Sequence, residues 1–365
     1  MVIREFLAER TQDQGARATL EDSGSWDPQI WTALGRDLGI LGLGVSEEFG
    51  GSGGTIVDAS ILAEEAGRQL IPGPFIGTLM LGIPLLNALS ATSASAADLL
   101  GSACAGERVI TVVSDVTIDP VISGDAVRLD AASANLVGKV QRVVDAKSAD
   151  ELLVIARDSD GALVLMAVPA KSEGLVIVDQ PSLDSTMNLS EVEFRSVVGV
   201  ELARGEVLAA AMSSMAWASL ILSSARYLGA AHGALDMAVD YAKIRQQFGR
   251  AIGSFQAIKH MLADVHIEIV SAAAAVTSAL RDENVGDPVR ASMAAASVKD
   301  ALWLSASTNI QVHGGVGFTW EHDAHLYFKN AVVGQQVFGT ADQHRDSIAN
   351  AVLPVAVLEE PEVRL

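Results

Sequence analysis

The first part of the chain has the hydrophobic spacing of helices. Residues 26–38 and residues 56–70 each place apolar side chains at intervals of about one helical turn. Pro72 and Pro74 follow the second of these segments, and proline cannot continue a helix. We therefore expect an N-terminal helical domain over residues 1–106.

The pattern changes over residues 107–204. Short runs rich in β-branched residues appear there, separated by clusters of Gly, Asp and Ser, at residues 109–113, 152–155, 163–168 and 175–178. Short strands at close spacing, with no long helical pattern between them, are typical of a small antiparallel barrel or sandwich. We expect such a β domain in the middle of the chain.

Helical spacing returns over residues 205–365. One apolar stripe consists of Trp217, Leu220, Ile221, Leu228, Leu235 and Val239, and a second of Ile258, Leu262, Val265, Ile269, Val276 and Leu280. An alanine-rich segment at residues 291–310 predicts a third helix that allows close packing. Such a set suits a four-helix bundle. The predicted fold class is thus α+β, in the order helices, β domain and helical bundle.

The charge of the chain excludes some classes of function. Its 25 basic and 45 acidic residues give a net charge of −20, whereas a nucleic-acid binder needs a basic face. The same charge disfavours anionic membrane surfaces, and we expect no apolar run that approaches the roughly 20 residues of a membrane span. Cys104 is the single cysteine, so no intramolecular disulfide forms. We expect a soluble, cytoplasmic protein that binds neither nucleic acid nor membrane.

Familiar catalytic motifs are weak. His322 and His325 share a helical face beside Glu321, but the order Glu-His-Asp-Ala-His differs from the His-Glu-x-x-His of zinc hydrolases. We therefore expect no metal site. Ser52 lies in a formal Gly-x-Ser-x-Gly, but no β-branched run precedes it as a nucleophile elbow requires. A turn between helices is the simpler interpretation of that segment.

Two longer motifs carry a family resemblance. Residues 241–256 read YAKIRQQFGRAIGSFQ and residues 311–318 read QVHGGVGF, with weaker matches at residues 42–51 and 64–68. These segments resemble the signatures of the acyl-CoA dehydrogenase family. That family has a helical domain, a β domain and a C-terminal four-helix bundle, in the same order as the hydrophobic pattern predicts.

The resemblance implies FAD as the cofactor. The residues that match family positions contacting an FAD bound mainly in a neighbouring subunit are Arg245, Phe248, Gln256, Gln311, Gly314 and Gly315, to which we add Thr340. A fixed arginine neutralises a pyrophosphate well, and glycine lets the backbone approach a ligand closely. Without the resemblance, Arg245 could pair with an acidic neighbour, and the glycines could form a helix C-cap and turn.

The positions of the family's catalytic base are different here. Most members place a glutamate, which removes the α-proton of the thioester, where this chain has Phe338. A minority place it at the position of Ser219. Neither side chain can act as a general base on a carbon acid. Residues 112–118 and 141–144 also differ from the Thr-Glu-Pro loop ending in Gly-Ser-Asp and the later Trp- or Phe-Ile-Thr with which the family holds the isoalloxazine ring.

The family residues that this chain retains are mostly those with which members contact the FAD of a neighbouring subunit. We therefore expect the non-catalytic half of a heteromeric acyl-CoA dehydrogenase, with a homologous catalytic subunit, an acyl-CoA substrate held mainly by that subunit, and an electron-transferring flavoprotein as partners. The run at residues 317–323 resembles members of steroid degradation. Two alternatives stay open: a homotetramer with Glu321 or Asp342 as a displaced base, and a scaffold without enzymatic activity.

Overall fold

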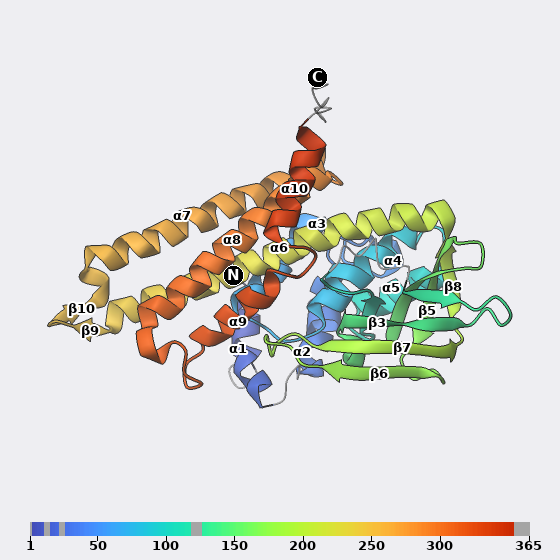
Figure 1. The fold of residues 1–365 in the computed structure, drawn as a ribbon, viewed down its shortest axis with the longest axis horizontal. Coiled ribbons are helices and arrows are strands. Elements are labelled where there is room, and N and C mark those ends of the chain that lie inside the picture. The colour runs from blue at the N-terminus through green and yellow to red at the C-terminus, as the bar shows by residue number, and fades with distance from the viewer. Residues whose placement is uncertain (1, 11–14, 22–25, 118–125, 354–365) are drawn as a thin grey trace, which may run out of the picture.

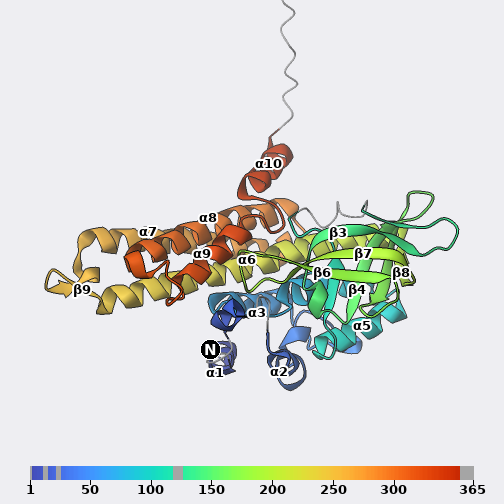
Figure 2. The same ribbon diagram turned by 60° about the horizontal axis from the view of Figure 1, so that its bottom comes forward.

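The structure is a computed structural model that describes residues 2–10, 15–21, 26–117 and 126–353. Ile118, the last residue of the predicted flavin segment 112–118, lies outside the described residues. The sheet lies at one end of the elongated molecule, and the helices of the C-terminal region extend away from it to the other end (Figure 1). The N-terminal helices lie below both the sheet and helix α6 in Figure 2.

The N-terminal region is helical, as the spacing predicted. Its α-helices are α1 (Val2–Arg10), α2 (Pro28–Thr32), α3 (Ile56–Arg68), α4 (Ile83–Leu89) and α5 (Ala94–Cys104), with π-helical segments at Ala33–Asp37 and Phe75–Gly82. Helix α3 begins at a capping box, in which the Thr55 side chain accepts from the backbone while Asp58 bonds back to the Thr55 N–H. The apolar face of α3 then packs on α6.

In the described part of the chain, eight strands form one sheet. They are β1 (Ile110–Val113), β2 (Val127–Leu129), β3 (Leu136–Val144), β4 (Glu151–Arg157), β5 (Leu163–Pro169), β6 (Leu175–Gln180), β7 (Leu189–Val197) and β8 (Val200–Arg204). The order is β6-β7-β3-β2-β4-β5-β8, with β1 paired to β4.

The expectation of a purely antiparallel β domain was wrong in one respect. Strand β4 runs parallel to both β1 and β2, while the other neighbours are antiparallel, so the sheet is mixed. Parallel neighbours need a long crossover connection. Between β1 and β4 the chain forms β2 and β3, so the connection between these two parallel strands is long.

The C-terminal region is a helical bundle. Its elements are α6 (Gly205–Ile244), a short hairpin of β9 (Gln246–Gln247) and β10 (Arg250–Ala251), α7 (Gln256–Ala279), α8 (Pro288–His313), α9 (Ala324–Gly334) and α10 (Ala341–Val352). Helix α6 packs against α7, α8 and α9, and α10 packs on α8. The fold class is therefore the one that the sequence predicted, with helices on either side of the β region in chain order.

Among the described helices, α6 and α7 are long and apolar enough to cross a membrane by length and composition alone. This finding corrects the expectation that no apolar run approaches such a length. It is weak as an indication of membrane spanning, because the core helix of a soluble protein passes the same test. In α6, 56% of the most apolar window is buried inside the molecule, whereas in α7 the value is only 22%.

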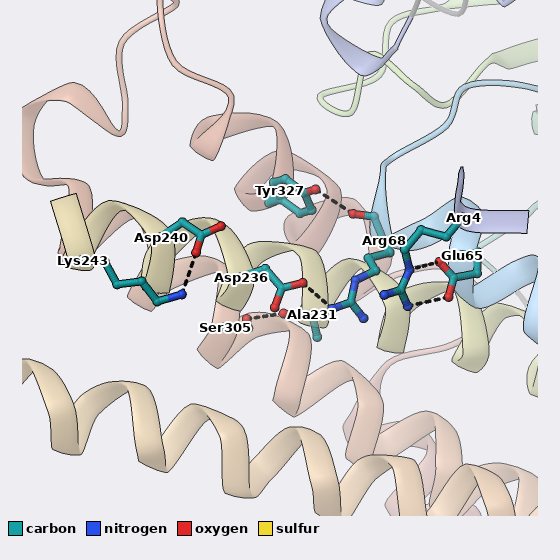
Figure 3. A network of polar contacts seen from close by, with 9 residues as sticks. All are labelled: Arg4, Glu65, Arg68, Ala231, Asp236, Asp240, Lys243, Ser305 and Tyr327. Carbon is teal, nitrogen blue, oxygen red and sulfur yellow. Dashed lines mark hydrogen bonds and ion pairs between the residues drawn. The ribbon is translucent and has the colours of Figure 1, made fainter. Parts of the chain in front are cut away.

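Helices α3 and α6 approach each other backbone to backbone. A Cβ atom built on Gly67 would lie 1.8 Å from the Arg226 carbonyl oxygen, and one built on Gly229 would lie 1.9 Å from the Glu64 carbonyl oxygen. Polar contacts flank this crossing, since Arg4 pairs with Glu65 (Figure 3). The crossing therefore fixes the N-terminal helices against the bundle.

Candidate functional site

Arg245 lies at the end of α6, at the tip of the bundle farthest from the sheet (Figure 1). Its N–H donates to the Tyr241 carbonyl over 2.9 Å, and its carbonyl accepts from the Ile252 N–H over 2.8 Å. Its backbone is thus fixed on both sides. The guanidinium is exposed and has no hydrogen-bond or ion-pair partner among the residues that the structure describes, which leaves it available to a ligand or a partner.

Phe248 is placed at the tip of the β9–β10 hairpin by an unusual backbone conformation. Its φ of 51° and the φ of 76° at Gly249 are both left-handed, as a tight two-residue turn requires. The Phe248 side chain is 91% exposed, and its ring lies edge-on to the ring of Phe255 at 6.0 Å. A bulky residue held this way projects away from the chain's own core.

Gly314 and Gly315 follow the end of α8, where Gly314 has a left-handed φ of 61°. In the described structure, a Cβ built on either glycine would meet nothing within 4 Å. The Tyr241 ring stacks on the His313 ring with 4.2 Å between centroids, so the ends of α6 and α8 meet here. The glycine backbone is therefore open to a ligand beside the end of α6.

The structure brings six of the seven predicted cofactor residues to this end of the bundle, which we call the bundle tip. It comprises Arg245, Phe248, Gln256, Gln311, Gly314 and Gly315. Gln256 is the exposed first residue of α7, and Gln311 is exposed in the last turn of α8. Thr340 lies apart from them, as the N-cap of α10, where its hydroxyl accepts from the Gln343 N–H over 3.2 Å.

Exposed apolar side chains surround the bundle tip, a feature that sequence reasoning missed. Ile244 is 76% exposed, Phe318 is 71% exposed and Trp320 is 67% exposed. Both the ring and the backbone of Trp320 have partners. Lys329 Nζ lies 4.0 Å from the centre of the ring, and Arg17 donates to the backbone carbonyl over 2.9 Å. Clusters of exposed apolar side chains are typical of surfaces that another molecule covers.

Phe338 occupies the position where the resemblance places the usual glutamate. Its side chain is buried, and its backbone is left-handed with a φ of 55°, an uncommon conformation for an aromatic residue. Its N–H donates to the Val116 carbonyl over 2.8 Å. At the second possible position, Ser219 is buried and its hydroxyl donates to the Ala216 carbonyl over 3.0 Å.

A buried lysine supports the segment around Phe338. Lys299 Nζ donates to the carbonyls of Gly334 and Val337 over 2.5 and 2.9 Å. Burial lowers the pKa of Lys299 to about 7. Burial, and then the nearby charge of Lys299, lower the pKa of His344 to about 4, although a bond with the Phe338 backbone opposes this shift. At neutral pH His344 is therefore uncharged, and neither Lys299 nor His344 places a carboxylate at the position of Phe338.

The two β segments and the Phe338 segment bond directly to one another. The Val116 N–H donates to the Arg142 carbonyl over 3.2 Å, and the Val116 carbonyl accepts from Phe338 as above. Arg142 has a left-handed φ of 53°, and its side chain forms a bidentate pair with Asp115, with Nε 3.0 Å from Oδ1. Sequence reasoning selected these segments but gave no sign that they touch.

The alternative bases are both on the surface. Asp342 has a side chain that is 91% exposed and accepts from Arg345 over 2.9 Å, and Glu321 is exposed as well. Both carboxylates are open to solvent, whereas general-base catalysis needs the base held within reach of the substrate carbon. Neither residue therefore has the environment of a poised base in this chain.

Ser52 and His322 form hydrogen bonds within the chain, whereas both ring nitrogens of His325 lack a partner among the described residues. The Ser52 hydroxyl donates to the Gly39 carbonyl over 2.6 Å, within the turns that precede α3. His322 Nδ1 accepts from the Ala324 N–H over 3.1 Å, while His325 is buried beside Trp320. Over the described residues, no group of three or more His, Cys, Asp or Glu is placed to hold a metal ion.

Comparison with known proteins identifies the family. The model described as "Acyl-CoA dehydrogenase, C-terminal domain" matches residues 208–353, and "Acyl-CoA dehydrogenase, N-terminal domain" matches residues 1–107. "Acyl-CoA dehydrogenase IpdE2" of Mycolicibacterium smegmatis is 31% identical over 344 residues, which cover 93% of this chain and 94% of that protein. The chain belongs to the acyl-CoA dehydrogenase family.

Two further relatives agree with this assignment. The IpdE2 acyl-CoA dehydrogenase of Mycobacterium tuberculosis is 30% identical over 329 residues, covering 90% of this chain and 88% of that protein. A solved structure of a variant of the Tcur3481-Tcur3483 steroid ACAD has a TM-score of 0.83 at 27% identity, and the match covers 95% of this chain and 94% of that chain.

Membership in the acyl-CoA dehydrogenase family implies FAD, and the two halves of that cofactor fit this chain differently. The bundle tip offers an unpaired guanidinium on a fixed backbone and open glycine backbone, which suit a pyrophosphate. The segments that would hold the isoalloxazine ring of the chain's own FAD are instead bonded to each other through Val116. The chain thus fits the ADP half of FAD and does not fit its ring system.

Proposed function

We propose that this chain is the non-catalytic subunit of a heteromeric acyl-CoA dehydrogenase, such as a heterotetramer, that introduces an α,β double bond into an acyl-CoA thioester. A homologous catalytic subunit carries the glutamate, the isoalloxazine site and most of the acyl-CoA site. Electrons leave through an electron-transferring flavoprotein in the cytoplasm. This chain, with domains at residues 1–106, 107–204 and 205–365, completes the ADP half of the partner's FAD.

The observation that carries this proposal is the bonded contact among three segments. Val116 joins the strand segment at Arg142 to the loop at Phe338 through two backbone hydrogen bonds, and the Asp115–Arg142 pair reinforces the first of these contacts. A flavin ring between these segments would have to break those bonds and displace a buried phenylalanine. The chain is therefore unsuited to hold a flavin ring and a general base of its own.

The exposed bundle tip supports the second half of the proposal. Arg245 and the open backbone at Gly314 and Gly315 point to an anion that comes from outside the chain. An arginine in front of a pyrophosphate forms charge-assisted hydrogen bonds, which are roughly twice as strong as neutral ones. The chain thus keeps the features that serve a neighbouring subunit.

The exposed surface of helix α7 is a further argument for a partner chain. Its inward stripe is buried in the bundle, but a second apolar stripe, Ala263, Ile267, Val270 and Ala274, is exposed at helical spacing. Ile267 is 62% exposed and Val270 is 52% exposed. A helix that is apolar on two faces is buried from two directions. A homologous subunit, which presents a similar bundle, is the occupant that we propose for this face.

The substrate class is inferred from relatives. The Tcur3481-Tcur3483 steroid ACAD variant matches 95% of this chain at 27% identity. We infer that the acyl-CoA of this enzyme is derived from a steroid. The resemblance of residues 317–323 to steroid-degradation members supports the same inference.

Co-expression with a homologous dehydrogenase tests the proposal. We expect the purified chain alone to be colourless, and the complex to be yellow with one FAD for each pair of chains. Flavin absorbance and native mass measure both quantities. A yellow homotetramer with one FAD per chain, active on acyl-CoA, would overturn the proposal in favour of a relocated base.

Arg245→Ala tests the contribution of this chain to the cofactor. The variant complex should assemble but lose FAD on dilution, because its pyrophosphate lacks the guanidinium. Arg195→Ala is the matched control, since Arg195 is an exposed arginine that pairs with Glu193 on the sheet. A complex with Arg245→Ala that keeps its full flavin content shows that the bundle tip does not hold the cofactor.

A further inference from the structure

A small cavity lies where α6, α9 and the sheet meet. Its volume is about 10 Å³, and its polar wall residues are Asp145, Asp184, Thr186, Arg226, Tyr227 and Asn330. Arg226 and Tyr227 come from α6, Asn330 comes from α9, and Asp145 follows β3. Polar side chains from both the β region and the bundle therefore surround one small space.

Three polar atoms of these walls have no partner in the described structure. They are Arg226 Nη1, the Tyr227 hydroxyl and Asn330 Oδ1, and all three are buried. The other ends of two of these side chains are bonded: Arg226 Nη2 donates to the Ile71 carbonyl over 3.1 Å, and Asn330 Nδ2 donates to Asp184 over 2.8 Å. The orientation of these two side chains is thus fixed. Leaving a buried polar atom unpaired costs roughly one to three times the net energy of a typical hydrogen bond.

The chemistry of the three atoms defines what can pair with them. Arg226 Nη1 and the Tyr227 hydroxyl can donate, while Asn330 Oδ1 can only accept. The occupant must therefore both accept and donate hydrogen bonds. An anion cannot donate to Asn330 and would face two nearby carboxylates, Asp145 and Asp184. A metal cation would face two donor groups, one of which is a guanidinium.

The size of the cavity limits the occupant further. A cavity needs a volume of roughly 10–15 Å³ to hold one water molecule, and buried waters typically make about three hydrogen bonds. The cavity has about 10 Å³, and three atoms lack partners. We infer that one ordered water molecule occupies this cavity, accepting from Arg226 and Tyr227 and donating to Asn330.

This internal water links parts of the chain that are far apart in sequence. Through Arg226 it connects to the Ile71 carbonyl, which follows α3, and through Asn330 to Asp184, which precedes β7. Helix α9, which carries Asn330, leads directly into the segment of Phe338. The water is therefore a structural ligand at the junction of the N-terminal helices, the sheet and the bundle, independent of the function proposed above.

A crystal structure of the chain, at a resolution that shows ordered water, tests the assignment directly. We expect one peak within hydrogen-bonding distance of Arg226 Nη1, the Tyr227 hydroxyl and Asn330 Oδ1. Crystals soaked in bromide should show no anomalous peak there. An empty cavity, or a bromide peak in it, overturns the inference.

The sign of a stability change gives a second test. In Tyr227→Phe the hydroxyl is lost while the ring stays packed. If water pairs with the hydroxyl, the melting temperature should fall by roughly 2–4 °C, as expected for one lost hydrogen bond. If the cavity is empty, removing an unpaired buried hydroxyl should leave the melting temperature unchanged or raise it, and that result overturns the inference.

Tyr327→Phe is the matched control for this measurement. The Tyr327 hydroxyl is also buried beside α6, but it donates to the Arg68 carbonyl over 2.7 Å and lies outside the cavity (Figure 3). Its removal gives the cost of losing one known hydrogen bond in the same part of the fold. We expect Tyr227→Phe to lower the melting temperature by a similar amount.

Discussion

Gly315→Ala separates the stability of the chain from its binding of cofactor. Gly315 does not have a left-handed φ, and among the described atoms nothing lies within 4 Å of a Cβ built there. Alanine therefore fits the folded chain without strain and restricts the unfolded chain, which should stabilise the protein by about 0.4–1 kcal/mol. The chain alone should melt at the same temperature as the wild type or slightly above it.

The same methyl group should weaken FAD binding in the complex. It covers the backbone that glycine leaves open to the pyrophosphate. Losing one hydrogen bond to a charged group costs about 1.5–3 kcal/mol, which corresponds to roughly a 10- to 150-fold rise in Kd. Titration of FAD into the deflavinated complex measures the Kd, and thermal melting of the chain measures stability.

Gly314→Ala is the companion variant. Its left-handed φ of 61° should cost the chain about 1–2 kcal/mol, so this variant loses stability as well as FAD affinity. An unchanged Kd for Gly315→Ala, with normal folding, would refute the reasoning that FAD lies against this loop. A large loss of stability in Gly315→Ala would instead refute the open space around that residue.

Two further predictions concern the fold. Gly229→Ala places a methyl 1.9 Å from the Glu64 carbonyl oxygen, so α3 and α6 must separate by about 1 Å. We expect the free energy of unfolding, measured with denaturant, to fall by about 3 kcal/mol. Unchanged stability would contradict the close crossing. Burial lowers the pKa of Lys299 to about 7, so above that pH the unfolded chain binds more protons than the folded chain. The free energy of unfolding should therefore rise by at most about 1.4 kcal/mol for each pH unit between about pH 7.5 and 9. Lys299→Met should flatten this rise, and equal slopes would contradict it.

The sequence predicted local structure well, because helices and strands follow from the spacing of neighbouring side chains. Helical spacing at residues 56–70 corresponds to α3, and the β-branched run at residues 163–168 corresponds to β5. Pairing between strands is less readable. The parallel pairing of β1 with β4 was missed because it depends on how a long connection crosses the sheet, and no local pattern records this.

For the candidate site as well, the sequence identified the residues and the structure showed their positions. Motifs in the sequence identified the residues of the bundle tip, and the structure placed six of them together at the end of α6, α7 and α8. Thr340 was grouped with them by motif alone, although it caps α10 elsewhere. The motif could not show this position, which depends on α10 packing against α8 where Arg345 pairs with Asp300, away from the end of α8.

By itself, the sequence determined which chemical groups this chain has: a phenylalanine and a serine where bases are usual, and an arginine with glycines that suit a pyrophosphate. Only the tertiary structure decided that Val116 bonds to both Arg142 and Phe338, and that three unpaired polar atoms meet in one small cavity. The reason is physical. Residue identity sets the available donors and acceptors, whereas their pairing depends on contacts between segments that lie far apart in the chain.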